Sequence, residues 1–371
     1  MKKVNFNDLS IQYQNNKHNI DNAIKNVLEK QNFIQGDEVK AIESMLSEYT
    51  STKALSVANG TDALFIALKA LGVKAGDEVI TPAFTWVSTV EVIKLLNAKP
   101  VFIDISEDTF NLNESLINEL INEKTKVILP VSLFGRCPRL DRIKKISESN
   151  NIAMLEDAAQ SFGAKSNSNI SCSVSDIATT SFFPSKPLGC YGDGGCIFTK
   201  NKKLFDEVSM ISKHGQRSRY DYQRVGVNSR LDTLQAAILI EKFKVFENEI
   251  KLRNEVAKTY NKKLKNIDGL KCPIIPDENN RSVWAQYTVL LSKELSTKRD
   301  LIMDKLKSLG IPSALYYPAL LHKQEPYLDD SFLPVSEDVA SRVLSLPMYP
   351  YLTKDDIEYI SENLQIVIES L

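Results

Sequence analysis

The sequence predicts an α/β protein built on a largely parallel sheet that helices cover on both faces. Between residues 54 and 160, short strands that are apolar almost throughout alternate with segments of helical periodicity. Strands without a polar face are typical of parallel sheets that are buried on both sides. Beyond about residue 200 the alternation stops, and a long charged helix follows. We therefore expect a large domain over residues 1–250 and a small C-terminal α+β domain over 251–371, joined by a helix around 231–266.

Five strands alternate with four helices in the first half of the chain. The predicted strands are ALSVAN (54–59), EVITP (78–82), PVFIDI (100–105), KVILPVSLFG (126–135) and IAMLEDAAQ (152–160), and the helices between them are expected within 60–72, 83–98, 115–123 and 140–149. An N-terminal arm and two helices precede these elements, the second helix over 36–50 with acids in its first turn. Phe33 and Ile34, in the turn between the two helices, could pack against neighbouring structure or form part of a ligand rim.

The C-terminal domain is expected to contain two strands among helices. The predicted strands are VWAQYTVLL (283–291) and PSALYYP (312–318), and the predicted helices lie within 299–310, 336–346 and 353–370. Neither an internal repeat nor a low-complexity tract interrupts this order.

Composition excludes several classes of function. Among 371 residues, 46 Lys and Arg nearly balance 47 Asp and Glu, so no net field attracts nucleic acid or a membrane surface. The five cysteines are scattered and form no C-x-x-C pair, which indicates reduced thiols rather than disulfides or a zinc site. The polar N-terminus lacks the apolar core of a signal peptide, and no apolar run could span a bilayer. We expect a cytoplasmic protein.

Four common catalytic or nucleotide-binding motifs are absent from the sequence. It has no G-x-x-x-x-G-K-[ST] loop, no G-x-G-x-x-G after the first strand, no H-E-x-x-H and no G-x-S-x-G. The three histidines, His18, His214 and His322, lie in unrelated contexts. We expect neither a metal site nor a histidine triad.

The residues that follow the predicted strands are the best candidates for chemistry, because ligands of parallel sheets bind beyond the carboxyl ends of the strands. Gly60 and Thr61 open a helix whose N–H groups could hold a phosphate, although Asn-Gly-Thr is also an ordinary turn and cap. Asp157 ends a buried strand, where a carboxylate is costly unless it is paired with a cation. Trp86 could fill the core or lie against a planar ligand.

Lys186 lies between two apolar runs, in the connector TSFFPSKPLGCYGDGG (180–195), which is rich in proline and glycine. A lysine in a loop is usually a surface residue. A rigid connector could instead project it into a site where desolvation lowers its pKa and frees the amine as a nucleophile. Together with an acid at a strand end, a phosphate cup and an aromatic face, such a lysine meets the needs of one cofactor, pyridoxal phosphate.

At these residues the chain resembles the sugar-nucleotide aminotransferases of the DegT/StrS type. The segments that carry the resemblance are NGTDAL, GDEVITPAFTWVST, PVFIDI, EDAAQSFGA, TSFFPSKPLGCYGDGG, KHGQ, GVNSRLDTLQAAIL and SLPMYPYL, in this order over nearly the whole chain. The resemblance implies the aspartate aminotransferase type I fold, pyridoxal 5′-phosphate as cofactor, and a homodimer with active sites at the subunit interface.

The resemblance also assigns roles to individual residues. Lys186 matches the Schiff-base lysine and general base, and Asp157 matches the partner of the ring nitrogen. The other cofactor-binding residues that it implies are Gly60, Thr61, Trp86, Gln160, Ser181 and, reaching over from the neighbouring subunit, Asn228. The implied substrate-binding residues are Arg230, Tyr317 and His214.

Within the family, the sequence is most similar to enzymes that aminate C3 of UDP-2-acetamido-2-deoxy-3-oxo-glucuronate, with L-glutamate as donor, for surface polysaccharides such as O-antigen. Arg230 matches the arginine that binds the sugar carboxylate, which suits a guanidinium fork. Tyr316 departs from an expected His-Tyr-Pro segment, so another UDP- or dTDP-linked 3-keto or 4-keto sugar is the alternative substrate. A sensor or a sugar dehydratase on the same fold is disfavoured by Lys186.

Overall fold

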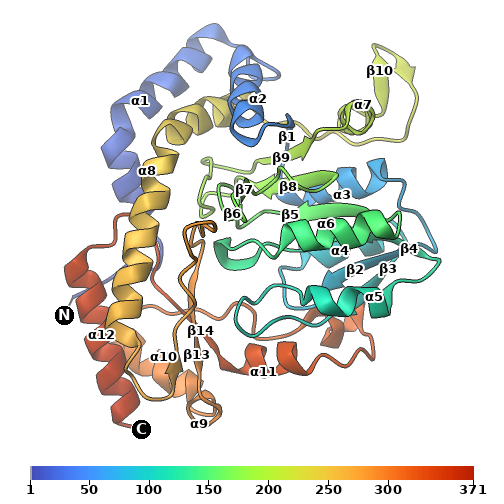
Figure 1. Ribbon diagram of the computed structural model, residues 1–371. Coiled ribbons are helices and arrows are strands. Elements are labelled where there is room, and N and C mark those ends of the chain that lie inside the picture. The colour runs from blue at the N-terminus through green and yellow to red at the C-terminus, as the bar shows by residue number, and fades with distance from the viewer. Residues whose placement is uncertain (1) are drawn as a thin grey trace.

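The computed structural model describes residues 2–371, and its central feature is a seven-stranded sheet with the order β1-β9-β8-β5-β4-β2-β3 (Figure 1). In that order the strands are β1 (Lys53–Val57), β9 (Gly195–Thr199), β8 (Ile177–Ser181), β5 (Ala153–Asp157), β4 (Thr125–Ile128), β2 (Glu78–Pro82) and β3 (Lys99–Ile103). The four pairings from β8 to β3 are parallel, and β9 runs antiparallel to both its neighbours. The predicted α/β class with a mostly parallel sheet is confirmed.

Helices pack on both faces of this sheet, because its strands direct apolar side chains to either side. One face is covered by α3 (Gly60–Ala70), α4 (Ser88–Leu95) and α7 (Lys202–Ile211). The other is covered by α2 (Asp37–Thr50), α6 (Leu140–Ser149) and the first half of α8 (Thr233–Leu264). Each face has its own apolar core, and in β1 Leu55 and Val57 join one core while Ala54 joins the other.

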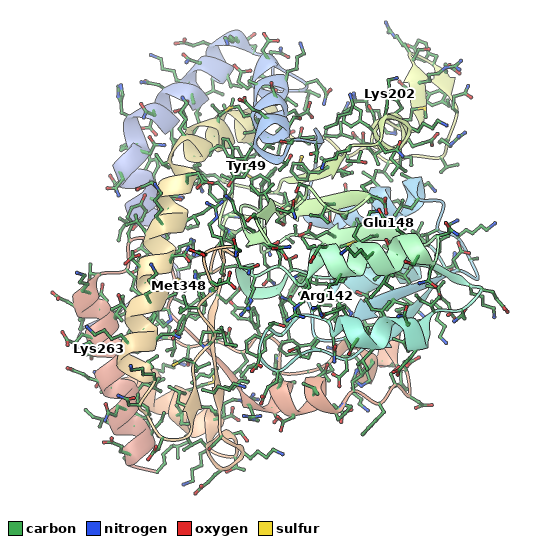
Figure 2. The ribbon with its side chains drawn as sticks, viewed as in Figure 1. Tyr49, Arg142, Glu148, Lys202, Lys263 and Met348 are labelled. Atoms are coloured by element: carbon green, nitrogen blue, oxygen red, sulfur yellow. The ribbon has the colours of Figure 1, made fainter. Side chains whose placement is uncertain are left out.

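A third apolar core surrounds the three-stranded antiparallel sheet β12-β13-β14 in the C-terminal part of the chain, while Val339 and Ala340 of this part join the core on the α3 face of the large sheet. Its elements are β12 (Leu270–Lys271), β13 (Tyr287–Leu291), α9 (Lys293–Ser296), α10 (Arg299–Ser308), α11 (Pro334–Arg342), β14 (Val343–Leu346) and α12 (Lys354–Glu369). The long helix α8 runs from the large sheet to this core, where it packs along α12 and beside the buried Met348 (Figures 1 and 2).

Two predictions in this part of the chain are wrong. Residues 312–318 do not form a strand, and only Ala314 makes an isolated bridge, to Ser345. The segment 336–346 is not one helix, because α11 ends at Arg342 and the next four residues form β14. All four β14 residues are buried and pair with β13, and a short apolar run of this kind is compatible with either structure until its pairing partner is known.

The remaining elements are peripheral to the two sheets. They are α1 (Leu9–Lys30), α5 (Ile117–Leu120), the hairpin β6 (Lys165–Ser166) and β7 (Asn169–Ile170), the hairpin β10 (Gln216–Ser218) and β11 (Asp221–Tyr222), and 3-10 turns at Glu114–Leu116, Leu133–Gly135, Leu321–Lys323 and Glu325–Tyr327. The β10–β11 hairpin projects from the body beyond α7 (Figure 1). Within residues 2–371, no helix combines the length and the apolar character that crossing a membrane requires.

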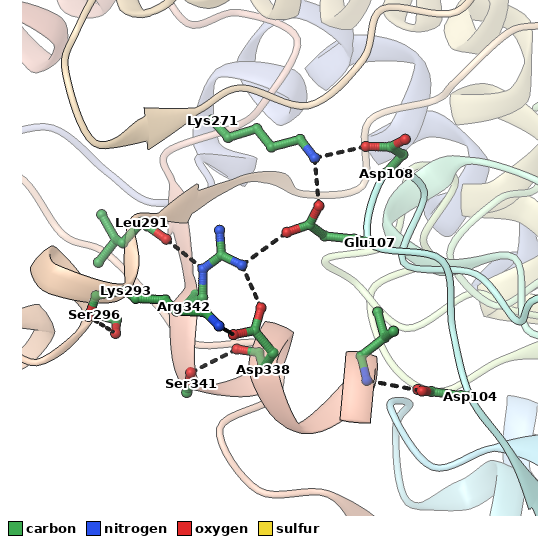
Figure 3. Close-up of polar contacts among 11 residues, drawn as sticks. Asp104, Glu107, Asp108, Lys271, Leu291, Lys293, Ser296, Asp338, Ser341 and Arg342 are labelled. Atoms are coloured by element: carbon green, nitrogen blue, oxygen red, sulfur yellow. Dashed lines mark hydrogen bonds and ion pairs between the residues drawn. The ribbon is translucent and has the colours of Figure 1, made fainter. Parts of the chain in front are cut away.

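An ionic network joins the loop after β3 to the C-terminal core (Figure 3). Lys271 contacts Glu107 and Asp108 at 2.8 Å each, and Arg342 contacts Glu107 at 2.9 Å. Nearby, Asp104 accepts hydrogen bonds from the backbone N–H groups of Val335 and Ser336, at 2.9 and 2.8 Å, at the start of α11. The loop after β3 therefore caps a helix that lies more than two hundred residues further along the chain.

Candidate active site

The predicted site residues converge at one edge of the large sheet. The antiparallel β9 separates β1 from β8, so β1 runs in the same direction as the parallel strands and its carboxyl end lies at their edge. At this edge Asn59 follows β1, and Asp157 and Ser181 are the last residues of β5 and β8. The sheet topology thus brings together residues that are more than a hundred positions apart.

A narrow cup forms where the start of α3 meets the ends of β8 and β9. A Cβ atom on Gly60 would lie 2.8 Å from the Ser181 Cβ, and one on Gly195 would lie 2.4 Å from the Asn59 carbonyl oxygen. Glycine is required at both positions by close contact rather than by a left-handed backbone. The Gly60 and Thr61 amides belong to the first turn of α3, whose N–H groups have no acceptor within the helix. The cup can therefore bind an anion such as a phosphate.

Asp157 is a buried acid at the centre of this edge, with a side chain that is only 4% exposed. Its Oδ1 accepts a hydrogen bond from the Ala159 backbone at 3.1 Å, and its Oδ2 accepts one from the Thr89 hydroxyl at 2.8 Å. Burial raises the pKa of Asp157, while these two bonds and the nearby Lys186 oppose the rise. A carboxylate has about four acceptor positions, so Asp157 retains capacity for a further, cationic partner.

Lys186 lies on a compact loop beside Asp157. Its backbone N–H donates to the Phe183 carbonyl at 2.8 Å. A Cβ atom on Gly189 would lie 2.5 Å from the same carbonyl oxygen, so glycine lets the chain return close to this turn. From the N-terminal arm, the Asn7 side chain donates to the Ser185 carbonyl at 3.3 Å. Burial lowers the pKa of Lys186, and the charge of Asp157 opposes this effect. A lowered pKa increases the fraction of neutral, nucleophilic amine.

An aromatic wall flanks the same space. Trp86 is 57% exposed, and its ring lies 6.2 Å from that of Tyr317. The Tyr317 hydroxyl accepts a hydrogen bond from Gln160 Nε2 at 3.0 Å, and Gln160 Oε1 in turn accepts one from the Phe134 backbone at 2.8 Å. The sequence allowed Trp86 either to fill the core or to lie against a planar ligand. Its exposed ring does not fill the core and is available to a planar ligand.

The three remaining predicted residues lie on the segment between α7 and α8. The Ser229 hydroxyl accepts a hydrogen bond from the Ala58 backbone at 3.1 Å, so the half-buried Arg230 lies next to the cup. Asn228 and His214 are exposed near the base of the projecting hairpin. No hydrogen bond or ion pair joins either residue to Lys186 within residues 2–371, and the exposure of Asn228 is compatible with its expected use by the neighbouring subunit.

Sequence reasoning missed the polar residues of the α4 start. Thr89 donates to Asp157, and the Ser88 hydroxyl lies 2.7 Å from the Thr61 hydroxyl. A Ser-Thr pair at the beginning of a predicted helix is the usual signal of a cap, so nothing in the sequence distinguished these residues from ordinary capping residues.

The chain is similar to known proteins in both sequence and structure. The profile of the DegT/DnrJ/EryC1/StrS aminotransferase family matches residues 14–365. The chain is 48% identical, over 97% of its length and 99% of the relative's, to a UDP-2-acetamido-2-deoxy-3-oxo-D-glucuronate aminotransferase of Pseudomonas aeruginosa. Among solved structures, a DegT DnrJ EryC1 StrS aminotransferase from Brucella abortus is 38% identical with a TM-score of 0.91, covering 97% of this chain and 98% of its own. NtdA from Bacillus subtilis, with bound cofactor PMP, is 29% identical with a TM-score of 0.91, covering 100% of this chain and 86% of its own.

Proposed function

Because this chain belongs to the DegT/DnrJ/EryC1/StrS aminotransferase family, we propose that it transfers the amino group of L-glutamate to C3 of UDP-2-acetamido-2-deoxy-3-oxo-glucuronate, with pyridoxal 5′-phosphate as cofactor. The observation that carries the proposal is the partly buried Lys186 near the buried Asp157, beside an anion cup. The product would enter the synthesis of a surface polysaccharide such as O-antigen. Five free thiols, four of them buried, support work in the reducing cytoplasm.

The residues present fit the cofactor. Gly60, Thr61 and Ser181 would hold its phosphate in the cup, and Trp86 would stack on its ring. Asp157 would face the ring nitrogen, where a positive charge relieves the cost of burying the carboxylate. When bound, the cofactor supplies an aldehyde that reacts with amines and a protonated ring that takes up electrons from the substrate carbon.

Lys186 serves two tasks in this proposal. Its Nζ would hold the cofactor, and its free amine would accept and return the proton of the reacting carbon. The lowered pKa of Lys186 favours the neutral form that can accept a proton. Asp157 would be ionised opposite a protonated ring nitrogen, and Gln160, which is held by Phe134 and Tyr317, would lie beside the ring hydroxyl.

The substrate would bind against Arg230, Tyr317 and His214. A guanidinium suits the uronate carboxylate, and Arg230 makes no ion pair with any residue in the described chain. The Tyr317 hydroxyl already accepts a hydrogen bond, so its own proton is free for a sugar oxygen. Another UDP- or dTDP-linked keto sugar is the alternative, because Tyr316 stands where a histidine is expected; its ring lies 5.8 Å from that of Tyr317.

The active enzyme would be a homodimer. Support comes from the β10–β11 hairpin, where Tyr220, Tyr222 and Val225 are 73%, 57% and 81% exposed. Exposed apolar side chains on a projecting hairpin are typical of an association surface, and the nearby Asn228 would reach the phosphate of the neighbouring subunit. Within each subunit, the separate C-terminal core supports a division into domains of residues 1–250 and 251–371.

Replacing Lys186 by alanine tests the proposal. The purified wild-type protein should be yellow from the lysine-bound cofactor, whereas Lys186→Ala should lose this absorbance and all amino transfer. Lys200→Ala, at an exposed lysine just after β9, is the matched control and should keep both. Transfer from glutamate is measured with a panel of UDP- and dTDP-linked 3-keto and 4-keto sugars. Full activity of Lys186→Ala would overturn the proposed chemistry, and activity on neutral sugars alone would overturn the uronate substrate.

A further inference from the structure

The first turn of α4 contacts two different parts of the cofactor site. Trp86, Ser88 and Thr89 lie within four consecutive positions, at the point where the chain leaves β2 and enters the helix. Trp86 has an exposed ring beside that of Tyr317, Ser88 contacts Thr61 of the cup, and Thr89 contacts Asp157. Neither Ser88 nor Thr89 has an assigned role, and the inference below rests on the proposed use of pyridoxal phosphate.

Thr89 is part of a buried chain of hydrogen bonds that ends on Asp157. The Thr85 and Thr89 hydroxyls are 3.1 Å apart, and the Thr89 Oγ1 lies 2.8 Å from the Asp157 Oδ2. Thr85 and Thr89 are 2% and 0% exposed, so water does not compete for these bonds. Thr89 donates to Asp157, and because its single hydroxyl proton is used in that bond, Thr85 donates to Thr89. Both bonds therefore point toward the Asp157 carboxylate.

This chain of hydroxyls stabilises the ionised form of Asp157 and its orientation. A buried hydroxyl chain whose members all donate toward a charge is polarised along its length, which strengthens each bond. Among residues 2–371, the only other donor to the carboxylate is the Ala159 backbone, on Oδ1, so within this part of the chain Thr89 alone restrains Oδ2. Without the Thr89 hydroxyl, the carboxylate could rotate and would have lost one of two bonds that offset its burial.

The contact between Ser88 and Thr61 supports the opposite end of the site. Their hydroxyl oxygens are 2.7 Å apart, and Ser88 is 8% exposed. If Ser88 donates to Thr61, the Thr61 hydroxyl is left free to donate to a phosphate oxygen. Adjacent residues of one helix turn therefore support the two groups that are proposed to bind the cofactor's phosphate and its ring nitrogen.

We propose that Thr89 is a positioning residue that holds the Asp157 carboxylate against the cofactor's ring nitrogen, while Ser88 positions Thr61 at the phosphate. The two roles are separable, because one depends on the nitrogen atom of the ring and the other does not. Thr89→Val removes only the hydroxyl at almost constant volume, whereas Thr89→Ser keeps it. Ser88→Ala serves as the matched variant at the phosphate end.

The experiment measures affinities of the apoenzymes for two ligands by titration calorimetry. One is pyridoxamine phosphate, and the other is its carbocyclic analogue, in which C–H replaces the ring nitrogen. We expect Thr89→Val to bind pyridoxamine phosphate about tenfold to hundredfold more weakly than the wild type, because it loses a hydrogen bond to a charged group. The same variant should bind the analogue as wild type does. Thr89→Ser should stay near wild type with both ligands, and Ser88→Ala should weaken both equally.

Each outcome has a distinct meaning. Equal losses for the two ligands in Thr89→Val, or no loss, would overturn the positioning role. If Thr89→Val does not fold, as judged by circular dichroism, Thr85→Val is used for the same comparison, because it removes only the outer donor. Its loss of affinity should be smaller and again confined to pyridoxamine phosphate. An equal loss of affinity for both ligands would refute the role. Failure of the wild-type protein to bind pyridoxamine phosphate at all would instead refute the proposed function.

Discussion

Lys242 tests whether burying a lysine without a hydrogen-bond partner lowers the stability of this protein. It lies on α8 and is only 1% exposed, and its ammonium group has no hydrogen-bond partner within residues 2–371. Its Nζ lies 4.9 Å from the centre of the Tyr191 ring, in the connector that follows Lys186. Burial lowers the pKa of Lys242 to about 8. We predict that Lys242→Met stabilises the protein.

The expected gain follows from the pKa. The ordinary value is 10.5 and the folded value is about 8, and because each unit corresponds to about 1.36 kcal/mol, the buried ammonium costs roughly 3 kcal/mol at pH 7. Methionine is similar in length and can contact the Tyr191 ring through sulfur. Losing the cation–π contact subtracts about 1 kcal/mol. We therefore expect the free energy of unfolding to rise by about 2 kcal/mol.

The gain should depend on pH with a definite sign. Below pH 8 Lys242 is protonated in both states, so its full cost is present. Between pH 8 and 10.5 the unfolded chain binds more protons than the folded one, and the wild type gains stability relative to the variant. The advantage of Lys242→Met should therefore be largest at pH 7 and should shrink as the pH approaches 10.

Urea unfolding followed by circular dichroism at pH 7 and at pH 10 provides the measurement. Lys244→Met is the matched control, since Lys244 lies two residues away on α8, its side chain is 56% exposed, and it pairs with Glu241 at 2.7 Å. This control should change stability by less than about 0.5 kcal/mol at either pH. A Lys242→Met protein that is no more stable than the wild type at pH 7, or whose advantage is the same at both pH values, would refute the reasoning.

Three further predictions concern the site and a buried histidine. Gly195→Ala should weaken cofactor binding and lower the free energy of unfolding by about 1 to 3 kcal/mol, because its Cβ would lie 2.4 Å from the Asn59 carbonyl oxygen. In a calorimetric titration with the cofactor, the control Gly192→Ala should bind as the wild type does, because its Cβ would meet only a side-chain amide. Arg230→Ala should weaken binding of a uronate substrate by about 1.5 to 3 kcal/mol and leave neutral sugars unaffected, and equal effects on both would contradict a carboxylate contact. His322 is fully buried and burial lowers its pKa, so below about pH 6.5 the unfolded chain binds more protons than the folded chain. The wild type should therefore lose stability on acidification through that range. In parallel thermal melts, His322→Phe should lose less stability than the wild type does.

The structure explains why the secondary structure was predicted well before residue 200 and less well after it. Strands such as 78–82 are bounded by turns and followed by helices of clear periodicity, so local pattern suffices. In the segment 336–346 the apolar residues fit a buried helix and a buried strand equally well. Only pairing with β13 made Val343–Leu346 a strand, and pairing is a non-local interaction.

The candidate site shows the same division. Lys186 and Asp157 could be proposed from the sequence because each occupies a local setting that is unusual for its residue type, and Gly60 because it follows a predicted strand and opens a helix. Thr89 could not, because a threonine at a helix start is ordinary and its partner Asp157 is 68 residues away.

By itself the sequence predicted the α/β class from periodicity, and the residue types at strand ends led to the proposed cofactor and to the candidate residues that would hold it. Only the tertiary structure decided how these residues are supported. The direction of β9 places Gly60 beside Ser181, the first turn of α4 supplies the Thr89 hydroxyl to Asp157, and α8 buries Lys242 beneath Tyr191. The physical reason is that support of this kind consists of contacts between distant segments, whose energies appear only when the sheet order brings those segments together.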